Sequence, residues 1–128
     1  MQVGPKVCLI NKYSASDGDL FPWGFRALGL GKLIGTRTWD GIVGISGSLP
    51  YMDGTDIRVP FFTSFDPKTG SWIIENHGVD PDILIDNDPV KEWNGEDQQL
   101  DRAIQEVMKE LQDRKPLPGV PTPRDFSK

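Results

Sequence analysis

The sequence predicts an α/β fold from three consecutive segments near its start. Residues 6–11 form a short continuous apolar run, which is typical of a strand buried on both faces of a parallel sheet. Residues 20–28 carry apolar side chains at roughly helical spacing, and residues 32–38 form a second strand-like run. The order of strand, helix and strand predicts one β-α-β unit over residues 6–38.

The predicted helix has a recognisable beginning and end. Pro22 suits the first turn of a helix, where the amide hydrogen that proline lacks would have no partner within the helix. Gly29 and Gly31 follow the last apolar position, Leu28, and glycine commonly terminates helices. We therefore expect the helix to end close to residue 28.

Glycines punctuate the middle of the chain, residues 39–79, and separate short runs rich in Val, Ile, Phe and Trp. These runs predict three strands, over residues 41–48, 56–63 and 71–75. The segment 66–70 (DPKTG) is a predicted turn, because aspartate, proline and glycine each favour a different turn position.

An irregular acidic stretch follows, with a short strand predicted at residues 83–85. Asn94 is the expected N-cap of a long helix over residues 95–114. One apolar stripe along that helix predicts that it packs on another surface: Leu100, Ile104, Val107, Met108 and Leu111. Residues 115–128 contain four prolines and cannot continue the helix, so we expect a tail that is extended and mobile or else lies along a neighbouring surface.

The composition excludes several classes of function. The net charge of -5 and the lack of a basic stripe disfavour binding to nucleic acid or to an anionic membrane. No apolar run approaches the roughly 20 residues of a membrane helix, and the start does not resemble a signal peptide. We expect a cytoplasmic location, while export of a longer parent protein stays open.

A single cysteine, Cys8, lies in the first apolar run. One cysteine can form neither an internal disulfide nor a cysteine-based zinc site. We therefore interpret Cys8 as a small buried hydrophobic residue of a strand.

The turn between the first strand and the helix, residues 13–19 (YSASDGD), is the first candidate for chemistry. A serine at the amino end of a helix can expose its hydroxyl next to free backbone N–H groups that could stabilise an oxyanion. Ser16, followed by the amide of Asp17, suits this role. The alternative is that Ser14, Ser16 or Asp17 simply caps the helix, and no glycine flanks Ser16 as in the nucleophile elbow of α/β-hydrolases.

The segment 11–22 (NKYSASDGDLFP) resembles the nucleophile segment of tricorn-type serine peptidases, and is similar to that of the carboxy-terminal processing proteases. Three later segments resemble the same family in the same order, at residues 33–39, 41–45 and 75–82. The resemblance covers residues 6–113. It implies a partial catalytic core of the ClpP and crotonase type over residues 1–114, with the proline-rich tail at residues 115–128.

At matching positions, the resemblance implies that Ser16 is the nucleophile and that the backbone amide of Asp17 is one oxyanion donor. It implies that Glu75 belongs to the catalytic tetrad and orients the base. A serine needs an adjacent base to attack at neutral pH. In the family this base is a histidine next to a serine, far upstream, and the second oxyanion glycine is also upstream. This chain contains neither.

His77 is the only histidine, and it invites a Ser-His-Glu interpretation within the chain. We interpret it as a turn histidine instead, because the family does not use this position for the base. A metal site is not expected, since the Asp17-Gly18-Asp19 motif lacks the later ligands of a calcium loop. We interpret the four tryptophans as packing residues: Trp23, Trp39, Trp72 and Trp93.

The resemblance thus implies a serine peptidase that hydrolyses short peptides through an acyl-enzyme, without a cofactor. This chain would carry the nucleophile and be inactive alone. The expected partners are peptide substrates and the rest of a parent protein with propellers, a PDZ-like and a helical subdomain, in a homo-oligomer. A non-catalytic binding or assembly module with a peptidase-like core remains open, as does a crotonase-like acyl-binding domain.

Overall fold

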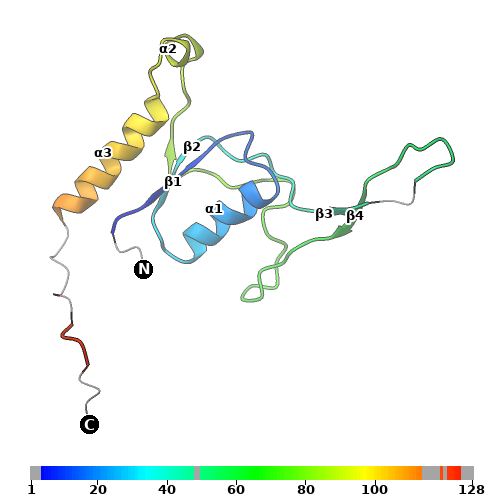
Figure 1. The fold of residues 1–128 in the computed structure, drawn as a ribbon, viewed down its shortest axis with the longest axis horizontal. Helices are drawn as coiled ribbons and strands as arrows, with labels where there is room; N and C mark the ends of the chain where they lie inside the picture. The colour runs from blue at the N-terminus through cyan, green and yellow to red at the C-terminus, as the bar shows by residue number, and fades with distance from the viewer. Residues whose placement is uncertain (1–3, 48–49, 114–118, 120, 125–128) are drawn as a thin grey trace.

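The computed structural model describes residues 4–47, 50–113, 119 and 121–124. Its body is a three-stranded parallel sheet in the order β1-β2-β5, from which a two-stranded ribbon extends to one side (Figure 1). β1 spans Val7–Ile10, β2 spans Lys32–Gly35 and β5 spans Ile83–Leu84. The predicted α/β class is confirmed.

The helix α1 (Asp17–Ala27) connects β1 to β2, and the two strands pair in parallel from Val7 opposite Lys32 to Ile10 opposite Gly35. The predicted β-α-β unit is therefore confirmed. α1 begins three residues earlier than predicted, so Pro22 lies in its second turn and is buried there.

The end of α1 matches the glycine prediction. Gly29 has a φ of 61°, and its amide donates to the carbonyl of Arg26. The amide of Leu30 donates to the carbonyl of Phe25 at 3.0 Å, which completes a Schellman motif.

Side chains of β1 alternate between the two faces of the sheet, and each face carries one helix. Cys8 and Ile10 pack with Phe25 of α1 and with Leu33 in the core. Burial raises the pKa of the Cys8 thiol. Leu9 lies on the opposite face and is 42% exposed, so the expectation that the first strand is buried on both faces is wrong.

The second face carries α3 (Gln98–Gln112), whose N-cap is Asp97. Its buried residues are Gln99, Ala103 and Glu106, while Leu100, Ile104, Met108 and Leu111 are exposed. The predicted apolar stripe therefore packs only along one of its edges. Glu106 anchors the helix to the sheet through a 2.7 Å ion pair with Lys32.

A short helix, α2 (Pro89–Trp93), precedes α3 and was missed by the sequence analysis. Asp88 caps it by accepting the amide of Val90 at 2.8 Å, and Pro89 occupies its first turn. Asn94 ends α2 instead of beginning the next helix, so the predicted N-cap is wrong. Residue 114 and most of the predicted tail lie outside the described residues, and residues 119 and 121–124 form no helix or strand.

The ribbon consists of β3 (Gly44–Ser46) and β4 (Val59–Phe62), which pair antiparallel (Figure 1). Both strands lie within predicted ones. The third predicted strand, residues 71–75, is wrong, because only a single bridge forms between Phe65 and Trp72. Ile74 has a φ of 39°, which is incompatible with a strand.

The predicted turn at residues 66–70 is confirmed, with the Gly70 amide donating to the Asp66 carbonyl at 2.8 Å. None of the helices in the described part of the chain has both the length and the apolar character needed to span a membrane.

Candidate active site

The loop after β1 is held by hydrogen bonds that it makes with itself. The amide of Tyr13 donates to the Asn11 side-chain carbonyl at 2.9 Å, and the Asn11 amide donates to the Ser14 hydroxyl at 3.1 Å. Ser14 therefore uses its hydroxyl within the loop.

Ser16 occupies the N-cap position of α1, yet its side chain makes no capping hydrogen bond. The interpretation of Ser16 as a helix cap is confirmed for its N-cap position, but the expected capping hydrogen bond is absent. Its backbone has φ 56° and ψ -110°, a conformation that non-glycine residues rarely adopt. Ser16 is thus an exposed, strained serine in a turn between a strand and a helix. A nucleophile elbow has the same backbone arrangement, although no glycine flanks Ser16.

Asp17 is the first residue of α1. Among the described residues, no acceptor is bonded to its backbone N–H, while the amides of Gly18, Asp19 and Leu20 all donate to carbonyls of the turn. The amino end of the helix dipole favours negative charge at this place. The Asp17 amide is thus free to donate to a negatively charged group placed beside Ser16.

A segment that we call the bridging segment, residues 38–42, lies between the serine loop and the Glu75 turn. Towards the loop, the Trp39 amide donates to the Ser14 carbonyl at 3.0 Å, and the Ser16 amide donates to the Gly41 carbonyl at 3.1 Å. These two bonds fix the backbone on both sides of residue 15.

Glu75 meets the same segment from the other side. Its Oε2 atom accepts the amide of Ile42 at 2.9 Å, and the amide of Asn76 donates to the Asp40 carbonyl at 3.0 Å. Asn76 has a φ of 61°, so the chain turns sharply around Glu75. The bridging segment thereby connects the candidate nucleophile with the candidate tetrad glutamate.

Ser16 and Glu75 both open into one cleft of about 400 Å³. The remaining lining residues are Trp39 and Gly41 of the bridging segment, Val43 directly after it, and Ile45 and Pro60 of the ribbon. Trp39 is 60% exposed, so its interpretation as a packing residue is wrong, as it is for Trp72 and Trp93 at 71% and 90%. Trp23 packs against the core as expected.

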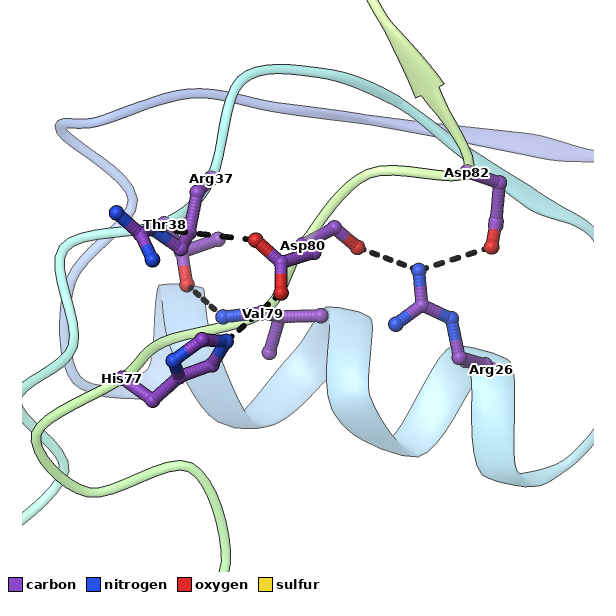
Figure 2. Close-up of polar contacts among 7 residues, drawn as sticks. All are labelled: Arg26, Arg37, Thr38, His77, Val79, Asp80 and Asp82. Carbon is purple, nitrogen blue, oxygen red and sulfur yellow. Dashed lines mark hydrogen bonds and ion pairs between the residues drawn. The ribbon is translucent and has the colours of Figure 1, made fainter.

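His77 lies outside this cleft lining and makes other contacts. Its Nε2 atom is 2.7 Å from Asp80 Oδ2, and the second oxygen of Asp80 faces Arg37 at 3.9 Å. Figure 2 shows the imidazole turned towards Asp80, with Arg26 of α1 reaching the Asp80 carbonyl and the Asp82 carboxylate. The turn interpretation of His77 agrees with these contacts.

The ribbon residues of the cleft and the role of the bridging segment were not predicted from the sequence. Val43 and Ile45 follow the bridging segment in a glycine-rich run, which was interpreted only as a strand. Within the described residues, no three His, Cys, Asp or Glu side chains are placed to hold a metal ion.

Comparison with known proteins gives one family. The sequence pattern described as "Peptidase family S41" matches residues 2–85, which include Ser16, Asp17 and Glu75. In solved structures, this chain is similar to part of the "Crystal structure of the tricorn protease", with a TM-score of 0.75 and 44% identity. That similarity covers 83% of this chain and 10% of the other.

Among curated relatives, the "Tricorn protease" of Thermoplasma volcanium is 45% identical over 109 residues, which are 85% of this chain and 10% of the relative. A "Putative Tricorn-like protease C-terminal subunit" of Sulfurisphaera tokodaii is 41% identical over 111 residues, with coverages of 87% and 13%. "Tricorn protease homolog 1" of Streptomyces coelicolor is 43% identical over 101 residues. The chain thus spans about a tenth of the length of these relatives.

Proposed function

The chain belongs to peptidase family S41, and from this membership we propose that it supplies the nucleophile of a serine peptidase of the tricorn type. One observation carries the proposal. Ser16 lies exposed in a strained turn, and its hydroxyl makes no capping hydrogen bond. It lines the same cleft as Glu75. In the proposed enzyme, this hydroxyl attacks the carbonyl carbon of a peptide bond.

The chemistry follows the usual course of acyl transfer. A base takes the proton of the Ser16 hydroxyl while the Oγ atom bonds to the carbonyl carbon, and the carbonyl oxygen becomes an oxyanion. The Asp17 amide donates to that oxyanion. The same base then protonates the leaving amine as the peptide bond breaks, and water hydrolyses the acyl-enzyme.

We propose that the base comes from a part of a longer parent polypeptide. The only histidine of this chain, His77, places its Nε2 atom 2.7 Å from Asp80 Oδ2 and lies outside the cleft lining. The resemblance implies an upstream histidine next to a serine, and an upstream glycine as the second oxyanion donor. Glu75 would orient the base from its place beside Ile42.

The finer details of fold and assembly belong to the same proposal. The parallel sheet with a helix on each face is compatible with half of a core of the ClpP and crotonase type. The parent would add propellers, a PDZ-like and a helical subdomain, form a homo-oligomer and cleave short peptides. The coverage of about a tenth of each relative supports a large parent.

A fluorophosphonate probe tests the proposal on the parent polypeptide, because it phosphonylates only an activated serine. We expect labelling of the unmodified protein, loss of labelling in Ser16→Ala, and retention in Ser14→Ala, whose hydroxyl bonds within the loop. An unlabelled parent would contradict the peptidase and leave the non-catalytic binding module. Labelling that survives in Ser16→Ala would assign the nucleophile to another serine.

A further inference from the structure

Asp19 is a fully buried carboxyl group in the first turn of α1, three residues after Ser16. Its Oδ1 atom accepts the backbone amide of Asp40 at 3.0 Å. Its Oδ2 atom is buried and makes no hydrogen bond with any described residue. Burying a carboxyl with one hydrogen bond is costly, and the amino end of the helix dipole offsets only part of that cost.

Asp40 holds the central, strained position of the bridging segment. Its φ of 92° lies in the left-handed region, which a non-glycine residue adopts only when its surroundings impose it. The Asp19 carboxyl holds the amide of Asp40, and the Asn76 amide holds its carbonyl at 3.0 Å. The peptide groups on both sides of Asp40 are therefore fixed in direction.

The next peptide group, between Gly41 and Ile42, carries this orientation into the cleft. The Gly41 carbonyl accepts the amide of Ser16 at 3.1 Å, and the Ile42 amide donates to Glu75 at 2.9 Å. A rotation at Asp40 would turn this peptide group, and both its carbonyl and its amide would then leave their partners. The Asp19 carboxyl thus fixes the backbone of Asp40, and the peptide group between Gly41 and Ile42 bonds to both Ser16 and Glu75.

We propose that Asp19 is a positioning residue of the peptidase site. It holds the backbone of Asp40 in place and thereby keeps Ser16 in the geometry that attack requires. The inference rests on the proposed function. Asp19 itself lies buried and does not touch a reacting atom. Because attack requires close alignment, a shift of about 1 Å at the nucleophile can cost roughly 100-fold in rate.

Two substitutions in the parent polypeptide separate the hydrogen bond from the charge. Asp19→Asn keeps an oxygen that can accept the Asp40 amide, whereas Asp19→Leu has the same branching at Cγ and no acceptor. We expect Asp19→Leu to lower kcat and the fluorophosphonate labelling rate by roughly 10- to 100-fold with little change in KM. We expect Asp19→Asn to restore both to within about three-fold.

Asp82 provides a matched control away from the cleft. Its Oδ2 atom accepts the Leu33 amide at 2.7 Å, and its other oxygen bonds to Arg26 (Figure 2). Asp82→Leu removes the same kind of carboxyl-to-amide bond, so we expect a lower unfolding temperature with kcat retained. A kcat loss in Asp82→Leu as large as that in Asp19→Leu would reduce Asp19 to a general structural role.

The possible failures are distinguishable. An unlabelled unmodified parent would overturn the peptidase function itself, whereas labelling of Asp19→Leu at the unmodified rate would overturn only the role of Asp19. If Asp19→Leu does not fold, amide hydrogen exchange in the unmodified protein decides. Slow exchange at the Asp40 amide supports the proposal, and exchange at the rate of a free amide contradicts it.

Discussion

The carboxylate of Glu75 accepts the backbone amide of Ile42 at 2.9 Å, across 33 residues of sequence. This bond brings the glutamate to the wall of the cleft that contains Ser16. One carboxylate oxygen is engaged with the backbone, which leaves the other for the proposed base.

Glu75→Gln tests the charge at this place. The amide oxygen of glutamine can still accept from Ile42, so the turn should stay folded, but the negative charge that orients and stabilises the protonated base is lost. We expect kcat of the parent polypeptide to fall roughly 100-fold or more, as for other groups in acid–base networks. Asn76→Asp, next in the chain and exposed, is a control that leaves Glu75 in place. Unchanged kcat in Glu75→Gln would contradict the tetrad assignment.

The β-α-β unit was predictable because its signals are local. Apolar runs mark β1 and β2, and Gly29 marks the end of α1. The start of α3 was mispredicted because Asn94 and Asp97 are both good capping residues, and only Asp97 is used. The competing signal, Asp88 followed by proline, was present in the sequence and was overlooked.

The sequence predicts candidate site residues, but it does not predict the backbone arrangement that brings Ser16 and Glu75 into one cleft. Ser16, Asp17 and Glu75 follow from family motifs, and their roles stay predictions. The left-handed backbones of Ser16 and Asp40 carry no local signature, because neither residue is glycine. These conformations result from hydrogen bonds between segments far apart in sequence, which residue patterns do not reveal.

Acid should weaken the attachment of α3 through Glu106. Hydrogen bonds from Lys32 and Arg102 lower the pKa of this carboxyl from 4.5 to about 2. A lowered folded-state pKa stabilises the fold above about pH 4.5, and this contribution is lost as the pH falls towards 2. We expect the unfolding free energy of the 128-residue chain to decline over that range, and less steeply in Glu106→Gln.

The same pair has a second limit at high pH. The hydrogen bond with Glu106 raises the pKa of Lys32 above 10.5. The stabilisation of the fold by the Lys32 charge is therefore present below pH 10.5 and is lost as the pH rises above it.

The acid prediction for Glu106 has a control in Glu96→Gln, which removes an exposed carboxyl elsewhere, in chemical denaturation between pH 2 and 7. If the unfolding free energies of Glu106→Gln and of the unmodified chain decline in parallel as the pH falls, Glu106 does not anchor α3 to the sheet.

Gly35→Ala should destabilise the sheet strongly. Gly35 has a φ of 133°, and a Cβ atom there would lie 1.9 Å from the carbonyl oxygen of Ile10. We expect about 1–2 kcal/mol from the backbone conformation and about 1–3 kcal/mol from the forced separation of β1 and β2.

Gly29→Ala isolates the first of these two costs. Gly29 also has a positive φ, of 61°, but a Cβ atom there would meet no atom within 4 Å. Urea denaturation of both variants therefore measures the steric part as their difference. Equal losses in the two variants would show that the close approach of the strands is not maintained in solution.

The 128-residue chain alone should show no peptidase activity. Among the described residues, no histidine lines the cleft with Ser16, and a serine without a base is a poor nucleophile. A fluorogenic peptide assay on the purified chain is expected to match the buffer blank. Turnover that disappears in Ser16→Ala and in His77→Ala would show that His77 is the base after all.

The isolated chain should also self-associate. β1 lies at an edge of the sheet, and Leu9 stands next to exposed apolar residues of α3. Unpaired edges with apolar neighbours favour pairing with another chain. We expect sedimentation velocity to show dimers or larger species, and Leu9→Lys to shift them towards monomer. A monomeric unmodified chain at tens of micromolar would contradict this.

The bridging segment also has a consequence for the order of folding. Its bonds to Asp19 and Glu75 close loops of 21 and 33 residues, so the chain must lose considerable entropy before either bond forms. The Ser16 amide bonds to Gly41 of this segment, so we expect the serine turn to acquire its strained backbone only after both loops have closed. A peptide containing the serine turn alone would therefore relax to an ordinary conformation, and partial unfolding would disable Ser16 before the β-α-β unit is lost.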